Sequence, residues 1–220
     1  MADHRALLVA CGTWPSPDAV KALVVQADHV IALDGALALC AEHGLQADVV
    51  LGDMDGIKPE ALVAFLDQGG TVIERAAQDA NDLSKGLAYL EALGTKGCTV
   101  IGATGGDPQQ EWANVLSCAA SSLEITCITT DHTYRFLLPH VHYSIDIGAG
   151  VEFSLFALPS ATGVQLKDAS FPLNDATLEM GSKGLHNVAL EGSVHLSFSE
   201  GRLMLMKPLT IEQAEGTSEA

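Results

Sequence analysis

The stretch "ADVVLGDMDG", residues 47–56, ends a hydrophobic run with two aspartates that are one residue apart. Residues 49–51 are typical of a buried strand, and Gly56 allows a sharp turn after it. Two carboxylates so close repel each other, so Asp53 and Asp55 need either a cation or full solvation. A divalent cation and a solvated turn are therefore the two interpretations of this pair.

Segments of strand and helix character alternate on both sides of this stretch, from residue 5 to about residue 131. The expected strands are 5–11, 29–34, 47–53, 71–75, 98–103 and 124–130. The expected helices are one that ends at Gln26 and those at 35–44, 58–70, 80–94 and 110–122. Such alternation indicates a parallel sheet covered by helices on both faces. The sequence thus predicts a three-layer α/β domain over residues 1–133.

The pattern changes after about residue 132, where short β-type runs are broken by Gly, Pro, Asn and Asp. These runs are 134–139, 142–148, 151–158, 163–169, 188–199 and 201–208. No helix of ten or more residues fits among them. We therefore expect a small antiparallel β-sandwich domain over residues 137–209, followed by a polar tail at 210–220.

Composition limits the classes of partner. Of the 220 residues, 48% are hydrophobic and 18% are charged, which argues against disorder. The formal net charge of −17 disfavours binding to a nucleic-acid backbone, because that binding needs clustered Lys and Arg. A small phosphate substrate remains compatible with this charge if a metal ion supplies the positive charge.

Location and redox chemistry follow from the apolar runs and the cysteines. The run at 6–10 is too short for a signal peptide, and no run approaches the ~20 residues of a membrane helix. We expect no membrane partner and a cytoplasmic location. The five cysteines include no CxxC pair, and we expect them to be small buried hydrophobes.

The ends of the expected parallel strands carry the candidate site, because ligands bind beyond the carboxyl ends of such strands. The groups that follow successive strands are Asp34; Asp53 and Asp55; Gln78, Asp79 and Asp82; and Gly105 and Gly106. Carboxylates suit Mg²⁺, and a glycine turn can bring backbone N–H groups close to an anion. Taken singly, each signal has an alternative as a solvated turn or a helix start. Together they favour metal-dependent transfer of a phosphate group.

Five short motifs occur in a fixed order, namely DGA (34–36), GDMDG (52–56), QDANDLSKGL (78–87), GGDPQQEWAN (105–114) and GLHN (184–187). Their order and spacing resemble those of the thiamine pyrophosphokinase family. That resemblance implies an α/β domain followed by a β-sandwich, assembled as a homodimer. It also implies transfer of a diphosphate from ATP to the hydroxyl of thiamine, which leaves AMP.

The resemblance also implies roles for individual residues. The catalytic residues would be Asp53, Asp55, Asp79 and Asp82, and the Mg²⁺ ligands would be Asp53, Asp55 and Asp79. Nucleotide and vitamin contacts would come from Asp34, Lys85, Gly105, Gly106, Asn114, His186 and Asn187. Domain 1–133 would bind ATP and Mg²⁺, and domain 137–209 would bind thiamine. For Lys85, an ion pair with Asp82 on the same helix is the alternative to a phosphate contact.

The chain departs from the family pattern in the GGRxDH motif, whose Arg, Asp and His are Asp107, Gln109 and Gln110 here. The acidic, metal-handling half of the pattern is retained, whereas the half that holds the nucleotide is altered. Two further readings therefore stay open. One is the same chemistry on another acceptor alcohol, such as a pterin. The other is a non-catalytic relative that binds a nucleotide or a thiamine derivative.

Overall fold

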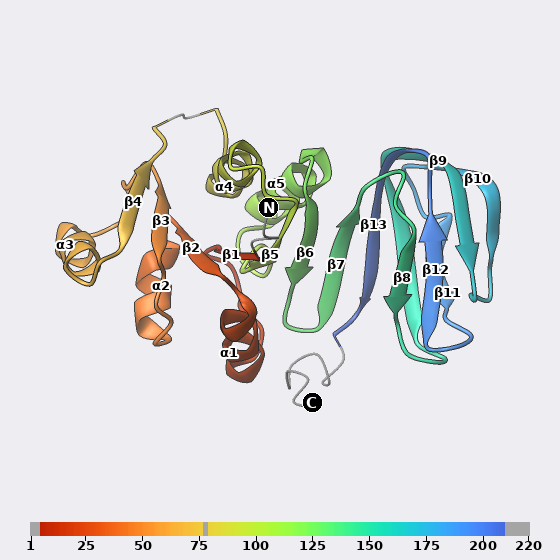
Figure 1. Ribbon diagram of the computed structural model, residues 1–220, viewed down its shortest axis with the longest axis horizontal. Helices are drawn as coiled ribbons and strands as arrows, with labels where there is room; N and C mark the ends of the chain where they lie inside the picture. The colour runs from red at the N-terminus through yellow and green to blue at the C-terminus, as the bar shows by residue number, and fades with distance from the viewer. Residues whose placement is uncertain (1–4, 77–78, 210–220) are drawn as a thin grey trace. The chain divides into compact units, whose positions relative to one another are not determined.

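The computed structural model describes residues 5–76 and 79–209 (Figure 1). Contacts between residues divide the chain into an α/β unit that runs to Asp131 and a β unit, His132–Leu209. Residue 78 and the expected polar tail, 210–220, lie outside the described residues. Each unit is described by itself below.

The α/β unit contains a parallel sheet, as the alternation predicts. Its strands are β1 (Ala6–Val9), β2 (His29–Leu33), β3 (Val49–Gly52), β4 (Thr71–Glu74), β5 (Gly97–Ile101) and β6 (Glu124–Ile128), in the order β4-β3-β2-β1-β5-β6. Every neighbouring pair in this order is parallel. The central strand β1 pairs Leu8 with Ile31 of β2 on one side and with Val100 of β5 on the other.

Helices cover both faces of this sheet. They are α1 (Pro17–Gln26), α2 (Ala36–Glu42), α3 (Pro59–Asp67), α4 (Asp82–Ala92) and α5 (Pro108–Ala120). On one face, Leu7 and Val9 pack in a cluster with residues of α1, α2 and α3. On the other face, Gly86 of α4 lies so close to Leu33 that an added Cβ would be 2.7 Å from a methyl carbon of Leu33. Side chains alternate between the faces of a strand, so β1 and β2 serve both layers.

The helices start where local signals place them. α1, α3 and α5 each begin with proline, which has no N–H to leave unpaired at a helix start. The Asn81 side chain accepts the Ser84 N–H at 2.9 Å, and this cap starts α4 at Asp82 rather than at the expected residue 80. No described helix has the length and hydropathy needed to cross a membrane.

The β unit contains only antiparallel pairs and, within the described residues 132–209, no helix. Its strands are β7 (His132–Leu137), β8 (Tyr143–Asp146), β9 (Glu152–Lys167), β10 (Leu173–Glu179), β11 (Gly184–Val188), β12 (Ser193–Ser197) and β13 (Glu200–Pro208). β13 lies between β7 and β9, and β12 lies between β8 and β9. β10 and β11 also pair with β9, so this strand connects the whole unit around one apolar core.

The observed strands differ from the expected ones in three places. The runs 151–158 and 163–169 form one strand, β9, whose pairing with β13 shifts register between Gly201 and Leu203. This irregularity lies opposite Pro159, which has no N–H to donate to a regular ladder. The expected run 188–199 is divided by a turn before β12. β10 was missed because its polar sequence does not resemble a strand.

Candidate active site

The site lies where the direction of the sheet connections reverses, between β1 and β5. The loops that follow these two strands are joined by hydrogen bonds. The Gly12 N–H donates to the Gly102 carbonyl at 2.8 Å, and the Thr13 hydroxyl donates to the Gly105 carbonyl at 2.6 Å. In open α/β sheets this reversal point is the usual place for a ligand.

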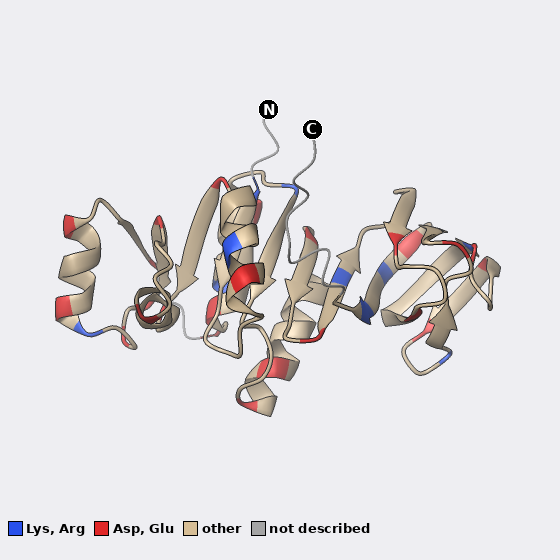
Figure 2. Cartoon of the chain, turned by 90° about the horizontal axis from the view of Figure 1, so that it is seen from below, with Lys and Arg blue, Asp and Glu red and all other residues tan. Residues whose placement is uncertain are grey.

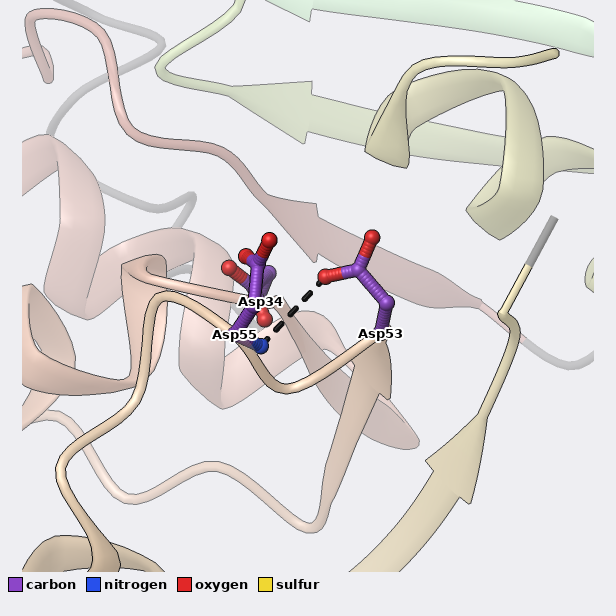
Figure 3. Close-up of side chains that lie close together, drawn as sticks. All are labelled: Asp34, Asp53 and Asp55. Carbon is purple, nitrogen blue, oxygen red and sulfur yellow. Dashed lines mark hydrogen bonds between the residues drawn. The ribbon is translucent and has the colours of Figure 1, made fainter. Parts of the chain in front are cut away.

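Three carboxylates meet beside this point (Figure 3). Asp34 follows β2, whereas Asp53 and Asp55 follow β3. One carboxylate oxygen from each lies within 4.8 Å of the others, and the set contains a buried, a half-buried and an exposed residue. Because β2 and β3 are parallel neighbours, their carboxyl ends bring these side chains to one edge.

Asp34 is the buried member of this cluster. The whole residue is only 7% exposed, and its Oδ1 has no hydrogen-bond partner in the described structure. Two glycines make room for it, since an added Cβ would lie 2.8 Å from Asp34 Cβ at Gly52 and 2.3 Å from Asp34 Oδ2 at Gly56. Burial raises the pKa of Asp34, and the negative charge of Asp82 raises it further. An unpartnered buried acceptor is costly unless something binds there.

Asp53 and Asp55 shift each other's pKa in opposite directions. The Asp55 N–H donates to Asp53 Oδ1 at 3.4 Å, and this bond is the main cause that lowers the pKa of Asp53 (Figure 3). The pKa of Asp55 is raised, mainly by its interaction with the Asp53 carboxylate. Asp53 therefore carries the more stable negative charge of the two.

Lys85 supplies a cation to the same edge. Its Nζ lies 3.0 Å from Asp82 Oδ1 and 3.4 Å from Asp53 Oδ2, and its side chain is only 6% exposed. Burial alone lowers the pKa of Lys85, but the contacts with Asp82 and Asp53 outweigh burial, and the pKa is raised. The expected ion pair with Asp82 is present, and it is shared with Asp53.

A pocket of about 410 Å³ adjoins this cluster, and Lys85 is among its lining residues, whereas Asp34 and Gly105 are not. Its charged lining residues in the described chain are four carboxylates and one lysine, namely Asp53, Asp82, Asp107, Glu111 and Lys85. Gly106 and Asn114 also line it. Figure 2 shows that Lys and Arg are few among many acidic residues in the α/β unit. A polyphosphate in this pocket would need a metal ion to offset the carboxylates.

The glycine loop before α5 is held by side chains of that helix. Asp107, where the family has arginine, is the N-cap of α5 and accepts the Gln109 N–H at 2.7 Å. Glu111 Oε2 accepts the Gly105 N–H at 3.0 Å. Asn114 donates to the Ala103 carbonyl at 2.9 Å. The altered motif therefore forms an ordered loop in which backbone N–H groups donate to the nearby carboxylates of Asp107 and Glu111.

Asn81 connects α4 to this loop. Its Nδ2 donates to Asn114 Oδ1 at 2.9 Å, and the Ser84 hydroxyl donates to Asn81 Oδ1 at 2.8 Å. The acidic start of α4 and the glycine loop are thus joined through two asparagines. Of the acidic residues expected near here, Asp82 lies in the pocket lining, whereas Asp79 lies on an exposed bend outside the three-carboxylate cluster.

His186 and Asn187, the expected vitamin contacts, belong to β11 of the other unit. His186 has a positive φ of 56° and an exposed ring whose Nδ1 lies 2.5 Å from Glu152 Oε1. Asn187 is buried, and its amide group bonds the backbone N–H and carbonyl of Phe171 at 3.0 and 2.8 Å. The structure thus gives Asn187 a role in holding the Phe171 loop.

Sequence reasoning missed two pocket residues in the loop after β1. Cys11 and Gly12 line the pocket, and Cys11 is exposed, so the expectation that it is a buried hydrophobe was wrong. Its position after a central strand was the available signal. Glu111 was also missed, because a contact from a side chain to a loop amide leaves no clear pattern in sequence.

Comparisons with known proteins agree with this architecture. A thiamin pyrophosphokinase from Candida albicans has a TM-score of 0.76 at 14% identity, over 94% of this chain and 90% of that chain. The thiamine pyrophosphokinase from Bacillus subtilis has a TM-score of 0.74 at 18% identity, over 92% of this chain and 98% of that chain. A thiamin pyrophosphokinase family protein from Enterococcus faecalis has a TM-score of 0.74 at 20% identity, over 94% and 99%. The chain therefore has the fold of these structures.

The sequence itself matches the family model described as "Thiamin pyrophosphokinase, catalytic domain" over residues 20–128. The resemblance indicated by the motifs is thereby confirmed, and the α/β unit of the chain belongs to the thiamine pyrophosphokinase family. A comparison with curated protein sequences gave no match.

Proposed function

We propose that this chain is a Mg²⁺-dependent diphosphotransferase that uses ATP and thiamine and forms thiamine diphosphate and AMP. The observation that carries this proposal is the cluster of Asp34, Asp53 and Asp55 beside a pocket at the reversal point of the sheet. The family of the α/β unit supplies the reaction class.

The residues present fit a magnesium ion. Three carboxylate oxygens from Asp34, Asp53 and Asp55 lie within 4.8 Å of one another, and the buried Oδ1 of Asp34 has no described partner. Mg²⁺ favours a few carboxylates together with water and phosphate oxygens. When bound, the ion would neutralise charge on the phosphates. Asp79 is proposed as a further ligand, as the family resemblance implies.

The other residues hold and orient the substrates in this proposal. Lys85 keeps Asp53 and Asp82 in place and brings positive charge to the pocket. Gly105, Gly106 and Asn114 frame the nucleotide. By family resemblance, His186 and Asn187 contact thiamine, and a homodimer forms the working unit.

The reaction exchanges one phosphorus–oxygen bond for another. The hydroxyl oxygen of thiamine forms a bond to the β-phosphorus of ATP and loses its proton. The bond between the β-phosphorus and the oxygen of the AMP leaving group breaks. The protein has to position the groups and offset their charge, which is the main requirement of phosphoryl-type transfer.

A specific observation favours a second candidate, a relative that binds a nucleotide without turning it over. The loop that carries an arginine in the family carries Asp107 here, and its amides already bond Asp107 and Glu111. A nucleotide can still bind in such a pocket even when its phosphates are no longer aligned with the acceptor hydroxyl for transfer.

One assay separates the two candidates. Purified protein is incubated with ATP, Mg²⁺ and thiamine, and AMP and thiamine diphosphate are measured over time, with EDTA as the control. We expect both products in equal amounts and no product in EDTA. If Mg-ATP binds but neither product forms, the enzyme is excluded and the binding protein remains.

A further inference from the structure

Glu111 occupies a position that a phosphate oxygen would be expected to use. Its Oε2 accepts the Gly105 N–H at 3.0 Å, and the pocket is lined by Glu111 and by Thr104 and Gly106, the two neighbours of Gly105. Gly105 has a positive φ of 78°, and an added Cβ would lie 2.4 Å from the Thr13 hydroxyl oxygen. The loop therefore tolerates only glycine here, and its amide is held toward Glu111.

A second carboxylate bonds an amide close by. Asp107 Oδ1 accepts the Gln109 N–H in the first turn of α5, so one amide of the loop and one amide of the helix start already bond the chain's own carboxylates. Asp107 does so as an ordinary cap. Glu111 instead reaches back six residues into the loop, which is a contact that helix formation does not require.

The charges in the pocket make this contact significant. The one lysine of the described lining, Lys85, already bonds Asp53 and Asp82. An incoming polyphosphate would meet the Glu111 carboxylate at the Gly105 amide. Glu111 is only half-buried, so its side chain can turn toward solvent when a stronger anion arrives.

We propose that Glu111 determines the affinity of this pocket for a metal-bound nucleoside polyphosphate, because its carboxylate competes with a phosphate oxygen for the Gly105 amide. This inference rests on the proposed function, since that function places the polyphosphate in this pocket. Glu111 acts here as an internal substitute for the anion and keeps the empty loop ordered.

The test compares Mg-ATP binding by calorimetric titration in wild type, Glu111→Ala and Glu111→Gln. Glu60→Gln serves as the matched control, because it removes the same charge from an exposed position on α3 outside the pocket lining. We expect Glu111→Ala to bind at least tenfold more tightly. The affinity of Glu111→Gln for Mg-ATP should lie between those of Glu111→Ala and wild type, because the amide oxygen of glutamine can still accept the Gly105 N–H. Glu60→Gln should change affinity less than twofold.

A readout without ligand tests the contact itself. The amide resonance of Gly105 should move upfield in Glu111→Ala, because it loses a bond to a carboxylate, and should stay in place in Glu60→Gln. If wild type binds Mg-ATP and Glu111→Ala binds it equally or more weakly, the inference is wrong while the proposed function stands. If Glu111→Ala binds Mg-ATP more tightly but no variant forms AMP, the inference about Glu111 is supported and the proposed enzymatic activity is excluded. If no variant binds Mg-ATP, both the inference and the proposed function are wrong.

Discussion

Asp34→Asn should stabilise the protein without metal and remove its response to Mg²⁺. Asp34 is buried, its Oδ1 has no described partner, and two more carboxylates lie within 4.8 Å. A buried acceptor without a partner costs about 1–3 kcal/mol. Asparagine removes the charge but keeps a polar group, so about 1 kcal/mol should be recovered. For a chain of this length, that corresponds to a rise in Tm of about 2–4 °C.

The pH dependence of this gain has a defined sign. The pKa of Asp34 is raised above its ordinary value of 3.8, so the folded protein holds the proton to higher pH than the unfolded chain does. The stability of wild type therefore falls as pH rises from 3.8 through the folded pKa, and the full penalty is present above it. The advantage of Asp34→Asn should be small near pH 4 and complete at pH 7.

Thermal unfolding in EDTA between pH 4 and pH 8 measures this effect, and the same scans with Mg²⁺ measure metal binding. Asp18→Asn, an exposed carboxylate on α1, is the control and should change stability by less than about 0.5 kcal/mol. We expect Mg²⁺ to raise the Tm of wild type and of the control but not of Asp34→Asn. The reasoning is refuted if Asp34→Asn lowers the Tm in EDTA at pH 7, or if its gain is the same at pH 4 and pH 7.

Four further outcomes are expected. Asp53→Asn should abolish AMP formation and lower the Tm of the metal-free protein slightly, because Lys85 loses one of its two carboxylate partners; full metal-dependent turnover would show that the aspartate pair is only a turn. Lys85→Met should lower stability in EDTA by about 1 kcal/mol, because its two carboxylate partners lose their cation, and Mg²⁺ should restore it; thermal scans that show no loss would contradict the ion pairs. Asp107→Ala should cost about 1 kcal/mol by removing the cap of α5, whereas Asp107→Asn should keep most of it, and equal Tm values for both would argue against the cap. Light scattering should give about twice the chain mass of 23.0 kDa, and a monomer at micromolar concentration would exclude the homodimer.

The sheet edge that carries the site was predictable, whereas the membership of the cluster was not. Parallel strands end at one edge, so the alternation of strands and helices places Asp34, Asp53 and Asp55 along the same edge of the sheet. Which carboxylates meet depends on the turn geometry. Asp34 and Met54 both have positive φ values, 43° and 66°, and side-chain composition does not specify such conformations.

Asp107 illustrates a signal that was present in the sequence and was not used. Aspartate followed by proline is a strong sign of a helix start, with the carboxylate as cap and proline at the first helical position. The family motif has an arginine at this position and therefore does not indicate a cap. The contact of Glu111 with the Gly105 amide depends on one rotamer of a long side chain, and no sequence pattern specifies it.

The position of β13 has a consequence for synthesis of the chain. This strand is the last of the β unit, yet it pairs with β7 on one side and β9 on the other. Until Glu200–Pro208 has left the ribosome, both neighbours expose unpaired backbone along a full edge, and such edges promote aggregation. The α/β unit has all of its strands by residue 128 and can form earlier. Translation of an mRNA truncated before the codon of Glu200 would therefore yield a folded α/β unit attached to an incomplete, aggregation-prone β unit.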